Sequence, residues 1–367
     1  PDAEAFAKTG VGVGCETTPD ATICLSRGIN IYLEVMLKGL ERLITAGTYD
    51  QEAIERWQKS MRGQLATRSA QQRLELQRQV LSALYGPQHP YTTTGLVTPE
   101  AIGKVSKDRL DEFRRGHLTA GNATLVIVGD FDPAQAERLA RASFGGWDKG
   151  TIDPPVNRQL AARTGPIHVG VIGKDDPQLS IQLAYPAPAG VDGQEGARQV
   201  LAEMIQIRVA DVRFKLGTTY GVRVGRRAHT GPSAYSVAGT VDAERAGESI
   251  RAIRDNIEQL RKGGTTFDVD FVRARRKVIS RLLGESTVTA EIAARLGFIA
   301  QFGLDEKFFT TMLHQVAIVS VAQIQALVDK ELAADREIVV VLGDRPHLDR
   351  AFKDAGLTAR LVEPVYQ

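Results

Sequence analysis

The chain has 367 residues, more than one hydrophobic core usually serves, so two domains are the first expectation. Its 46 Lys and Arg against 44 Asp and Glu leave a net charge of +2, which gives no electrostatic reason to expect nucleic acid or an anionic membrane as a partner. No apolar run reaches the roughly 18 residues that a membrane span needs. The chain begins with Pro1 and shows no signal sequence, so we expect it to be an internal part of a longer gene product.

The first predicted elements are two strands, at residues 11–16 and 23–27, around a turn that contains Pro19. In a hairpin centred just after that proline, Cys15 and Cys24 face each other, and facing cysteines can come close enough to form a disulfide. A disulfide would indicate an oxidising compartment such as the periplasm. The alternative is two small buried thiols, which leaves a cytoplasmic location open.

An internal repeat organises the middle and the end of the chain. Residues 106–130 combine a helical half, whose periodic residues are Leu110, Phe113 and His117, with a break and an apolar strand that ends in Gly-Asp. Residues 320–344 repeat this plan without a gap, at an offset of 214 (320 minus 106). The matched positions include Ser106 with Ser320, Leu118 with Leu332, Leu125 with Val339, Gly129 with Gly343 and Asp130 with Asp344. A repeat at this distance has the size of a domain, which indicates duplication.

The duplication predicts a domain at residues 1–147, a linker rich in Pro and Gly at 148–166 and a second domain at 167–367. Strands mixed with several helices indicate the α+β class, with a sheet whose helices pack on one face. The offset carries position 167 to a negative number, so we expect the first domain to lack its first strands and first helix. In the second domain, strands are predicted from 167, at 180–185 and as a pair within 220–241, and helices from Glu195 and at 246–262, 269–285 and 290–302.

Three stretches carry a resemblance to a known family. They are HPY at 89–91 with the stretch that follows to Pro133, IQLAYPAPAG at 181–190 and RFKLGTTYGV at 213–222. In order, spacing and duplication they resemble the pitrilysin/insulinase/mitochondrial-processing-peptidase-type zinc metallopeptidases (inverzincins), over nearly the whole chain. The resemblance implies two homologous αβ-roll domains, which form one half of a chamber in which unfolded peptides are cut.

In the catalytic half of such a peptidase, the resemblance implies an H-x-x-E-H motif on the first helix, where two His four apart bind zinc and the Glu acts as base. This sequence contains no such motif, and the helix that would carry it would lie before Pro1. The six histidines are scattered along the chain, at His89, His117, His168, His229, His314 and His347.

The family's third zinc ligand is a Glu near the end of a helix that residues 49–65 resemble, and here that position falls on Gln64. A neutral amide is a poor zinc ligand beside a carboxylate. A shifted register would offer Glu55 or Glu75 instead, although solvated helix charges are the simpler interpretation of both. We therefore expect no metal in this chain, and zinc in a homologous partner subunit that carries the motif.

Arg213 and Tyr220 match an Arg and a Tyr, seven residues apart, that the family places across the chamber from the zinc. A guanidinium and a phenol can donate hydrogen bonds to a scissile carbonyl or its developing oxyanion. On chemistry alone, a surface Arg and a Tyr that anchors a strand are the alternative.

Two further groups of residues are candidates for binding. In family terms, one stretch resembles the edge strand to which substrate adds by β-augmentation, and it comprises Gly14, Cys15, Glu16 and Thr17. A small basic cluster contains Arg223, Arg226 and Arg227. That cluster is either a solvated face or a site for acidic substrate groups or for the partner subunit.

Together these features predict the non-catalytic subunit of a heterodimeric zinc endopeptidase that degrades or processes unfolded peptides. The subunit would supply the Arg/Tyr pair and half of the substrate chamber. One alternative is a complete, active zinc endopeptidase whose H-x-x-E-H helix is absent from this chain, and another is a purely structural, core-like scaffold subunit. The expected partners are a homologous subunit with the zinc motif and peptide substrates, with no nucleic acid and no membrane span.

Overall fold

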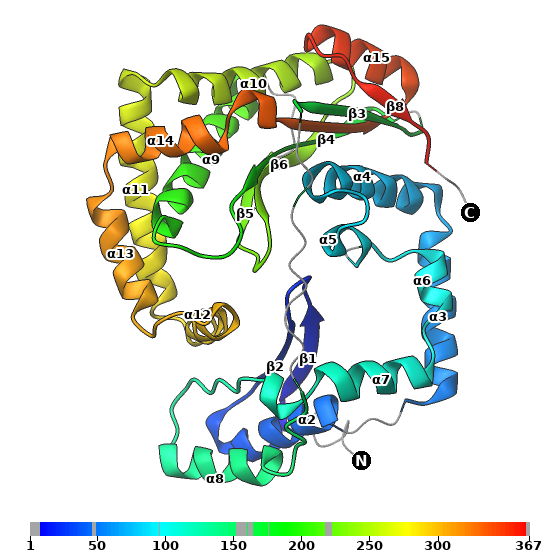
Figure 1. The fold of residues 1–367 in the computed structure, drawn as a ribbon, viewed down its shortest axis with the longest axis vertical. Helices are drawn as coiled ribbons and strands as arrows, with labels where there is room; N and C mark the ends of the chain where they lie inside the picture. The colour runs from blue at the N-terminus through cyan, green and yellow to red at the C-terminus, as the bar shows by residue number, and fades with distance from the viewer. Residues whose placement is uncertain are drawn as a thin grey trace. The chain divides into compact units, whose positions relative to one another are not determined.

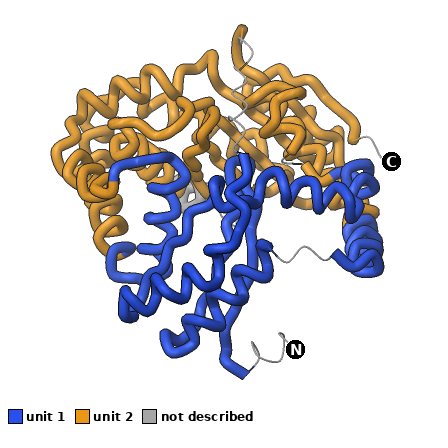
Figure 2. Tube along the Cα trace, turned by 60° about the horizontal axis from the view of Figure 1, so that its bottom comes forward, with its two compact units in different colours: residues 1–63, 98–156, 285–305 blue, residues 64–97, 157–284, 306–367 orange. Residues whose placement is uncertain are grey.

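The computed structural model describes residues 8–45, 49–94, 96–151, 160, 164–174, 176–216 and 222–364. The chain divides into two compact units (Figure 2), one formed by residues 1–63, 98–156 and 285–305 and the other by residues 64–97, 157–284 and 306–367. Each unit therefore draws on segments that lie far apart in the sequence. The predicted boundaries at 147 and 167 stay a prediction.

The second unit is built on a six-stranded sheet in the order β5-β6-β4-β7-β3-β8. The strands are β3 (Ile167–Ile172), β4 (Gln178–Ala187), β5 (Arg223–Arg227), β6 (Ser233–Asp242), β7 (Ile338–Gly343) and β8 (Arg360–Val362). β3 runs parallel to both β7 and β8, whereas β4 is antiparallel to β6 and β7. All six residues of β7 are buried, as expected for a continuous apolar run at the centre of a sheet that is covered on both faces.

Several helices cover one face of this sheet, and α4 (Arg68–Tyr85) covers part of the other (Figure 1). The first layer contains α9 (Glu195–Leu216), α10 (Ala246–Lys262), α14 (Val321–Glu331) and α15 (Arg345–Asp354), with α11 (Thr265–Glu285) and α13 (Phe308–Ile318) beside them. Alternate strand residues such as Leu179, Ile181 and Leu183 face this layer with no exposed surface. On the other face, α4 packs against β4, β7 and β3. A second layer on this sheet departs from the prediction of helices on one face only.

The first unit has a two-stranded sheet, β1 (Gly12–Thr17) with β2 (Thr22–Arg27), and a set of helices. The helices are α2 (Leu33–Thr45), α3 (Gln51–Leu65, in this unit up to residue 63), α6 (Pro99–Gly103), α7 (Lys107–His117), α8 (Pro133–Phe144) and α12 (Thr289–Phe302). α2 packs against both strands and against α8. The hairpin has the register that the sequence predicted, with Cys15 opposite Cys24.

The repeat is visible in the helix boundaries. Ser106 caps α7 by accepting a hydrogen bond from the Arg109 amide, and Ser320 caps α14 by accepting one from the Gln323 amide, 214 positions later. A short 3-10 helix follows each, η2 (Ala120–Asn122) and η3 (Ala334–Arg336). The bounds of both elements thus shift by the same offset.

The strand of the repeat forms in the second copy only. β7 lies between β4 and β3, whereas residues 124–129, its counterpart, form no strand and pair with none of the described strands. The prediction of a strand there is wrong for the first copy. The physical reason is that an extended apolar segment becomes a strand only where a neighbour takes up its backbone hydrogen bonds.

Candidate functional site

The predicted zinc-ligand position does not supply a metal site. Gln64 lies one residue before the end of α3 and is exposed. Within the described ranges, no group of three or more His, Cys, Asp or Glu side chains is arranged to hold a metal ion. An exposed amide that belongs to no such group does not fit a zinc ion.

The two alternative carboxylates differ from each other. Glu55 is exposed on α3 and accepts a hydrogen bond from Gln51 at 2.9 Å. Glu75 is buried in α4, where it accepts hydrogen bonds from Arg78 at 2.7 and 2.8 Å and from Gln79 at 2.6 Å. The interpretation of Glu75 as a solvated charge is therefore wrong. The hydrogen bonds from Arg78 to Glu75 raise the pKa of the Arg78 guanidinium. The Glu75 carboxylate therefore has a structural role within α4.

The Arg/Tyr pair falls at the edge of what the structure describes. Arg213 belongs to α9, but its side chain lies outside the described residues, and Tyr220 lies outside them altogether. The described chain resumes just before β5. The roles of both residues stay predictions.

The predicted peptide-binding strand is β1. Its only neighbour in the two-stranded sheet is β2, so its other edge pairs with none of the described strands. The residues in question, Gly14, Cys15, Glu16 and Thr17, are all exposed. Cys15 and Cys24 are joined by a disulfide in the structure. An exposed strand edge of this kind can accept backbone hydrogen bonds from an added strand.

Sequence reasoning missed two buried polar networks in the second unit. Tyr185 and Tyr235 are register partners in the sheet, and their hydroxyls donate to Glu337 and Glu331, each at 2.8 Å. Arg198, 2% exposed, donates to Glu331 at 2.9 Å. The only sequence signal for these networks is the presence of charged residues beside apolar runs.

These networks shift the ionisation of their members in opposite directions. Burial and the neighbouring carboxylate raise the pKa of Tyr235 well above its ordinary value. Burial alone would raise the pKa of Glu337, but His168, Arg254 and Tyr185 together outweigh it, so its pKa is lowered. The phenols thus stay protonated donors and Glu337 stays charged, which fixes the sheet to its helix layer.

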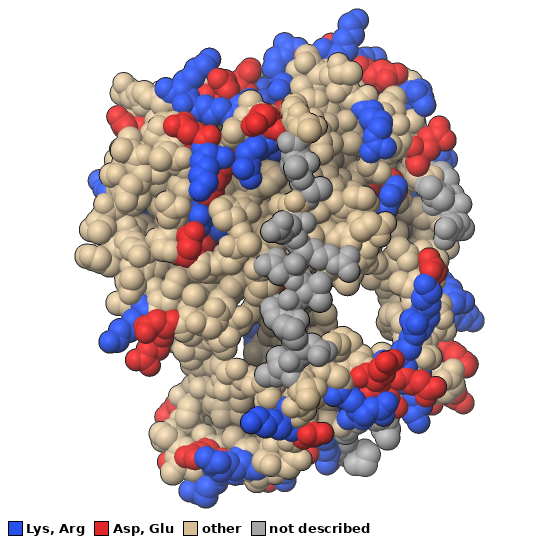
Figure 3. Space-filling model, in the orientation of Figure 1, with Lys and Arg blue, Asp and Glu red and all other residues tan. Residues whose placement is uncertain are grey.

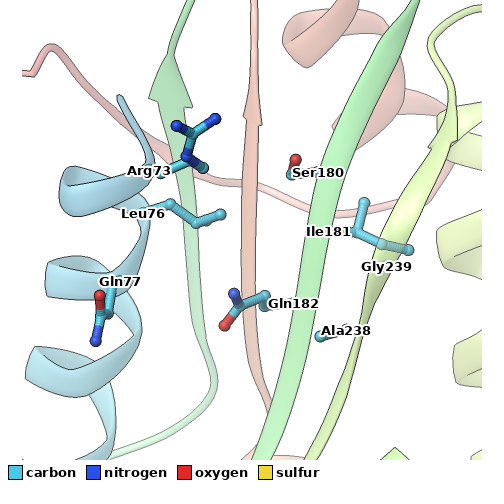
Figure 4. Close-up of a pocket in the computed structure, with 8 residues that line it drawn as sticks. All are labelled: Arg73, Leu76, Gln77, Ser180, Ile181, Gln182, Ala238 and Gly239. Atoms are coloured by element: carbon cyan, nitrogen blue, oxygen red, sulfur yellow. The ribbon is translucent and has the colours of Figure 1, made fainter. Parts of the chain in front are cut away.

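A cavity of about 320 Å³ opens on the face of the sheet that carries α4 (Figure 4). It is lined by Arg73, Leu76 and Gln77 of α4, by Ser180, Ile181 and Gln182 of β4, and by Ala238 and Gly239 of β6. The lining combines apolar surface with the polar side chains of Arg73, Gln77, Ser180 and Gln182, so the cavity offers both apolar contact and hydrogen-bonding groups. No sequence motif pointed to this place.

Two remaining expectations concern the charge of the surface and the presence of a membrane span. The face in Figure 3 carries Lys and Arg interspersed with Asp and Glu, in line with the near-balance of charge. No single described helix is long and apolar enough to span a membrane. The pair α13 and α14 meets that length and composition test only jointly, across a bend of 104°.

Comparison with known proteins identifies the class of this fold. Residues 104–277 match the family model of the peptidase M16 inactive domain. The crystal structure of a peptidase M16 inactive domain from Pseudomonas fluorescens matches with a TM-score of 0.80 and 22% identity, over 94% of this chain and 83% of that one. No curated protein matches the chain in sequence.

Two further solved structures share the fold. A protease from Helicobacter pylori matches with a TM-score of 0.79 and 13% identity, over 93% of this chain and 84% of that one. The periplasmic protease PqqL from Escherichia coli matches with a TM-score of 0.72 and 16% identity, over 94% of this chain but 38% of that longer one.

These matches confirm the predicted family and the α+β class. Residues 104–277, just under half of the chain, match the inactive domain of the M16 peptidase family, and the chain as a whole shares its fold with solved structures of M16-type proteins.

Proposed function

We propose that the chain is the non-catalytic subunit of a heterodimeric zinc endopeptidase that degrades or processes unfolded peptides. The match of residues 104–277 to an inactive M16 domain carries this proposal. Gln64 supports it, because an exposed amide stands where the family resemblance places a ligand Glu. In this proposal the zinc belongs to a homologous partner subunit that carries the H-x-x-E-H motif.

The chain's own contribution would be to hold the peptide. The exposed edge of β1, at Gly14 to Thr17, offers backbone hydrogen bonds that give affinity with little sequence selectivity. Arg213 and Tyr220 would donate hydrogen bonds to the scissile carbonyl of a peptide that the partner cleaves. Half of the substrate chamber would be formed by this chain.

Mixing the subunits tests the proposal. The chain is purified alone and together with a homologous subunit that carries the zinc motif, and hydrolysis of an unfolded peptide and bound zinc are measured for each. We expect no hydrolysis and no stoichiometric zinc for the chain alone, and hydrolysis for the pair. Zinc-dependent hydrolysis by the chain alone would overturn the proposal in favour of a complete peptidase.

The Arg/Tyr pair separates the proposal from a structural scaffold. In the reconstituted pair, Arg213→Ala and Tyr220→Phe each remove a donor to the carbonyl, and loss of one such donor typically lowers kcat about 100-fold or more. Arg251→Ala, at an exposed position on α10, is the matched control. Unchanged kcat in all three variants would leave only a scaffold role.

We also propose a periplasmic location, since the Cys15–Cys24 disulfide requires an oxidising compartment to persist. Alkylation of free thiols in fractionated cells, before and after reduction, measures the state of the pair. We expect both cysteines to resist alkylation until they are reduced. Reduced cysteines in a cytoplasmic fraction would contradict this location.

A further inference from the structure

The edge strand β5 presents its arginines to opposite faces of the sheet. Side chains alternate along a strand, and Arg226 points toward the helix layer, where it contacts Glu195 of α9 at 2.5 Å with 4% of its side chain exposed. Val224 packs against the core on that same side. Arg223 and Arg227 therefore lie on the opposite face, and both are exposed. The basic cluster seen in the sequence thus divides into one structural arginine and two free ones.

The two outward arginines are not neutralised by the rest of the described chain. Neither makes a hydrogen bond or ion pair with a described residue. Arg73 of α4, which lines the cavity of Figure 4, is likewise exposed and unpaired within the described ranges. Arg223 is the register partner of Ala238, a residue of the cavity wall. We call Arg73, Arg223 and Arg227, with the strand surface between them, the arginine face.

The strands of the arginine face carry almost no negative charge. Their outward positions hold small or neutral side chains, namely Gln178, Ser180, Gln182, Ala184, Gly225, Ala234, Ser236, Ala238 and Thr240. Asp242, at the far end of β6, is the one acidic residue at an outward position of β4, β5 and β6, and it accepts a hydrogen bond from the Glu244 amide. Unpaired cations over a neutral floor create a positive potential that favours an anionic ligand.

The backbone of β5 indicates that this ligand is extended. β5 is the terminal strand of the sheet, so its outer edge pairs with none of the described strands. Gly225, between the two arginines, carries no side chain on the face of the sheet that holds Arg223 and Arg227. An extended peptide can add to such an edge through backbone hydrogen bonds. Arg223 and Arg227 are four residues apart, which is about 13 Å along a strand.

We propose that the arginine face binds an acidic segment of an extended peptide, which adds to β5 with carboxylates at positions four residues apart. The proposal rests on the proposed function for the class of ligand, a peptide. It deepens that function by assigning a preferred charge pattern and a binding strand to this chain. Binding needs no partner subunit, because all of the residues involved lie in one compact unit.

The test uses the full chain alone and fluorescence anisotropy. One labelled, unstructured peptide carries Glu at two positions four residues apart, and a matched peptide carries Gln at both. We expect the Glu peptide to bind more tightly, by about two- to fivefold for each exposed ion pair. The difference should shrink as salt is raised.

Variants locate the site. Arg223→Gln with Arg227→Gln should abolish the advantage of the Glu peptide, and Arg73→Gln should reduce it. Arg251→Gln on α10, another exposed arginine of the same unit, should leave it intact. Thermal unfolding of each variant checks that the fold is retained. Equal affinity for the Glu and Gln peptides, or unchanged discrimination in the double variant, would overturn the proposal.

Other outcomes are also decisive. Binding to phosphatidylglycerol vesicles without binding to the Glu peptide would show a lipid surface as the ligand and refute a peptide site. The experiment is independent of catalysis, so its failure leaves the mixing experiment above untouched. Conversely, intact peptide discrimination with no hydrolysis by the reconstituted pair would sink the proposed function alone.

Discussion

The two copies of the repeated segment have the same helix boundaries but different surroundings. α7 and α14 begin and end 214 positions apart, and each starts at a serine cap. α14 buries Ile324 and Leu327 against α9 and α10, whereas α7 buries none of its residues, not even the equivalent Leu110. Local sequence thus sets where a helix begins and ends, while burial depends on what lies against it.

The strand that follows shows the same difference more strongly. Val339 of β7 has no exposed surface, whereas its equivalent, Leu125, is 42% exposed. Both segments are apolar and rich in β-branched residues, so their intrinsic preferences agree. Pairing with β3 and β4 therefore accounts for the strand in the second copy.

Hydrogen exchange should reveal the largest difference between the copies. We expect the amides of β7 to exchange at least about a thousandfold more slowly than those of residues 124–129, because paired core strands open only with large parts of the fold. Mass spectrometry of peptides from the two segments measures this. Comparable protection of both segments would show that residues 124–129 have found a strand partner.

A matched pair of truncations tests whether burial separates the helices. Leu327→Ala removes a buried side chain of α14 and should lower the free energy of unfolding by about 2–5 kcal/mol. Phe113→Ala, at the equivalent position of α7, is half exposed at 50% and should cost less than about 1 kcal/mol. Urea denaturation of both variants gives the comparison. Equal losses would mean that α7 is covered by something in solution.

We expect the amides of the β1–β2 hairpin to be protected less than those of β7 and more than those of residues 124–129, because the hairpin has one strand pair and a covalent link. A two-stranded sheet alone is marginally stable, and a disulfide that closes a loop of this size contributes about 2–3 kcal/mol. We expect Cys15→Ser with Cys24→Ser to speed amide exchange in β1 and β2, while exchange in β7 stays unchanged. Faster exchange in β7 as well would place the hairpin in the same cooperative unit as the large sheet.

Much of this fold could be predicted from local pattern. The helix predicted at residues 246–262 has those bounds in α10, and the hairpin register followed from the position of its turn. Local signals of this kind, caps and turns, act within a few residues. They therefore carry over from sequence to structure.

What the sequence did not predict depends on contacts between distant segments. The packing of α4 on the second face of the sheet joins residues more than 80 positions apart, and no periodicity shows it. Glu331 and Glu337 look like surface charges in the sequence but are buried with donors from other elements. Glu75 looks the same and is buried with donors from its own helix. The division of the basic cluster became clear only when Arg226 was seen to face Glu195.

The smallest expected effect is a pH-dependent difference in stability that arises just after the two copies of the repeat. In the second copy His347 lies between two carboxylates, with Nδ1 2.6 Å from Asp344 and Nε2 3.1 Å from Glu244, whereas the first copy has Pro133 at the equivalent position. Hydrogen bonds to Asp344 and then Glu244 raise the pKa of His347 above its ordinary value of 6.5. The folded state therefore holds this proton more tightly than the unfolded state does.

The sign of the pH dependence follows from that difference. The contribution of His347 to stability is fully present below the unfolded pKa, near 6.5, and is lost as the pH rises through the raised folded pKa. Urea denaturation of the wild type and of His347→Gln, from about pH 5.5 upward, should show an advantage of the wild type that fades with rising pH. His117→Gln, whose ring packs on Phe113 in α7, is the control from the first copy. A wild-type advantage that grows with pH would contradict the interaction of His347 with Asp344 and Glu244. A histidine held neutral in the folded state would give that opposite dependence of stability on pH.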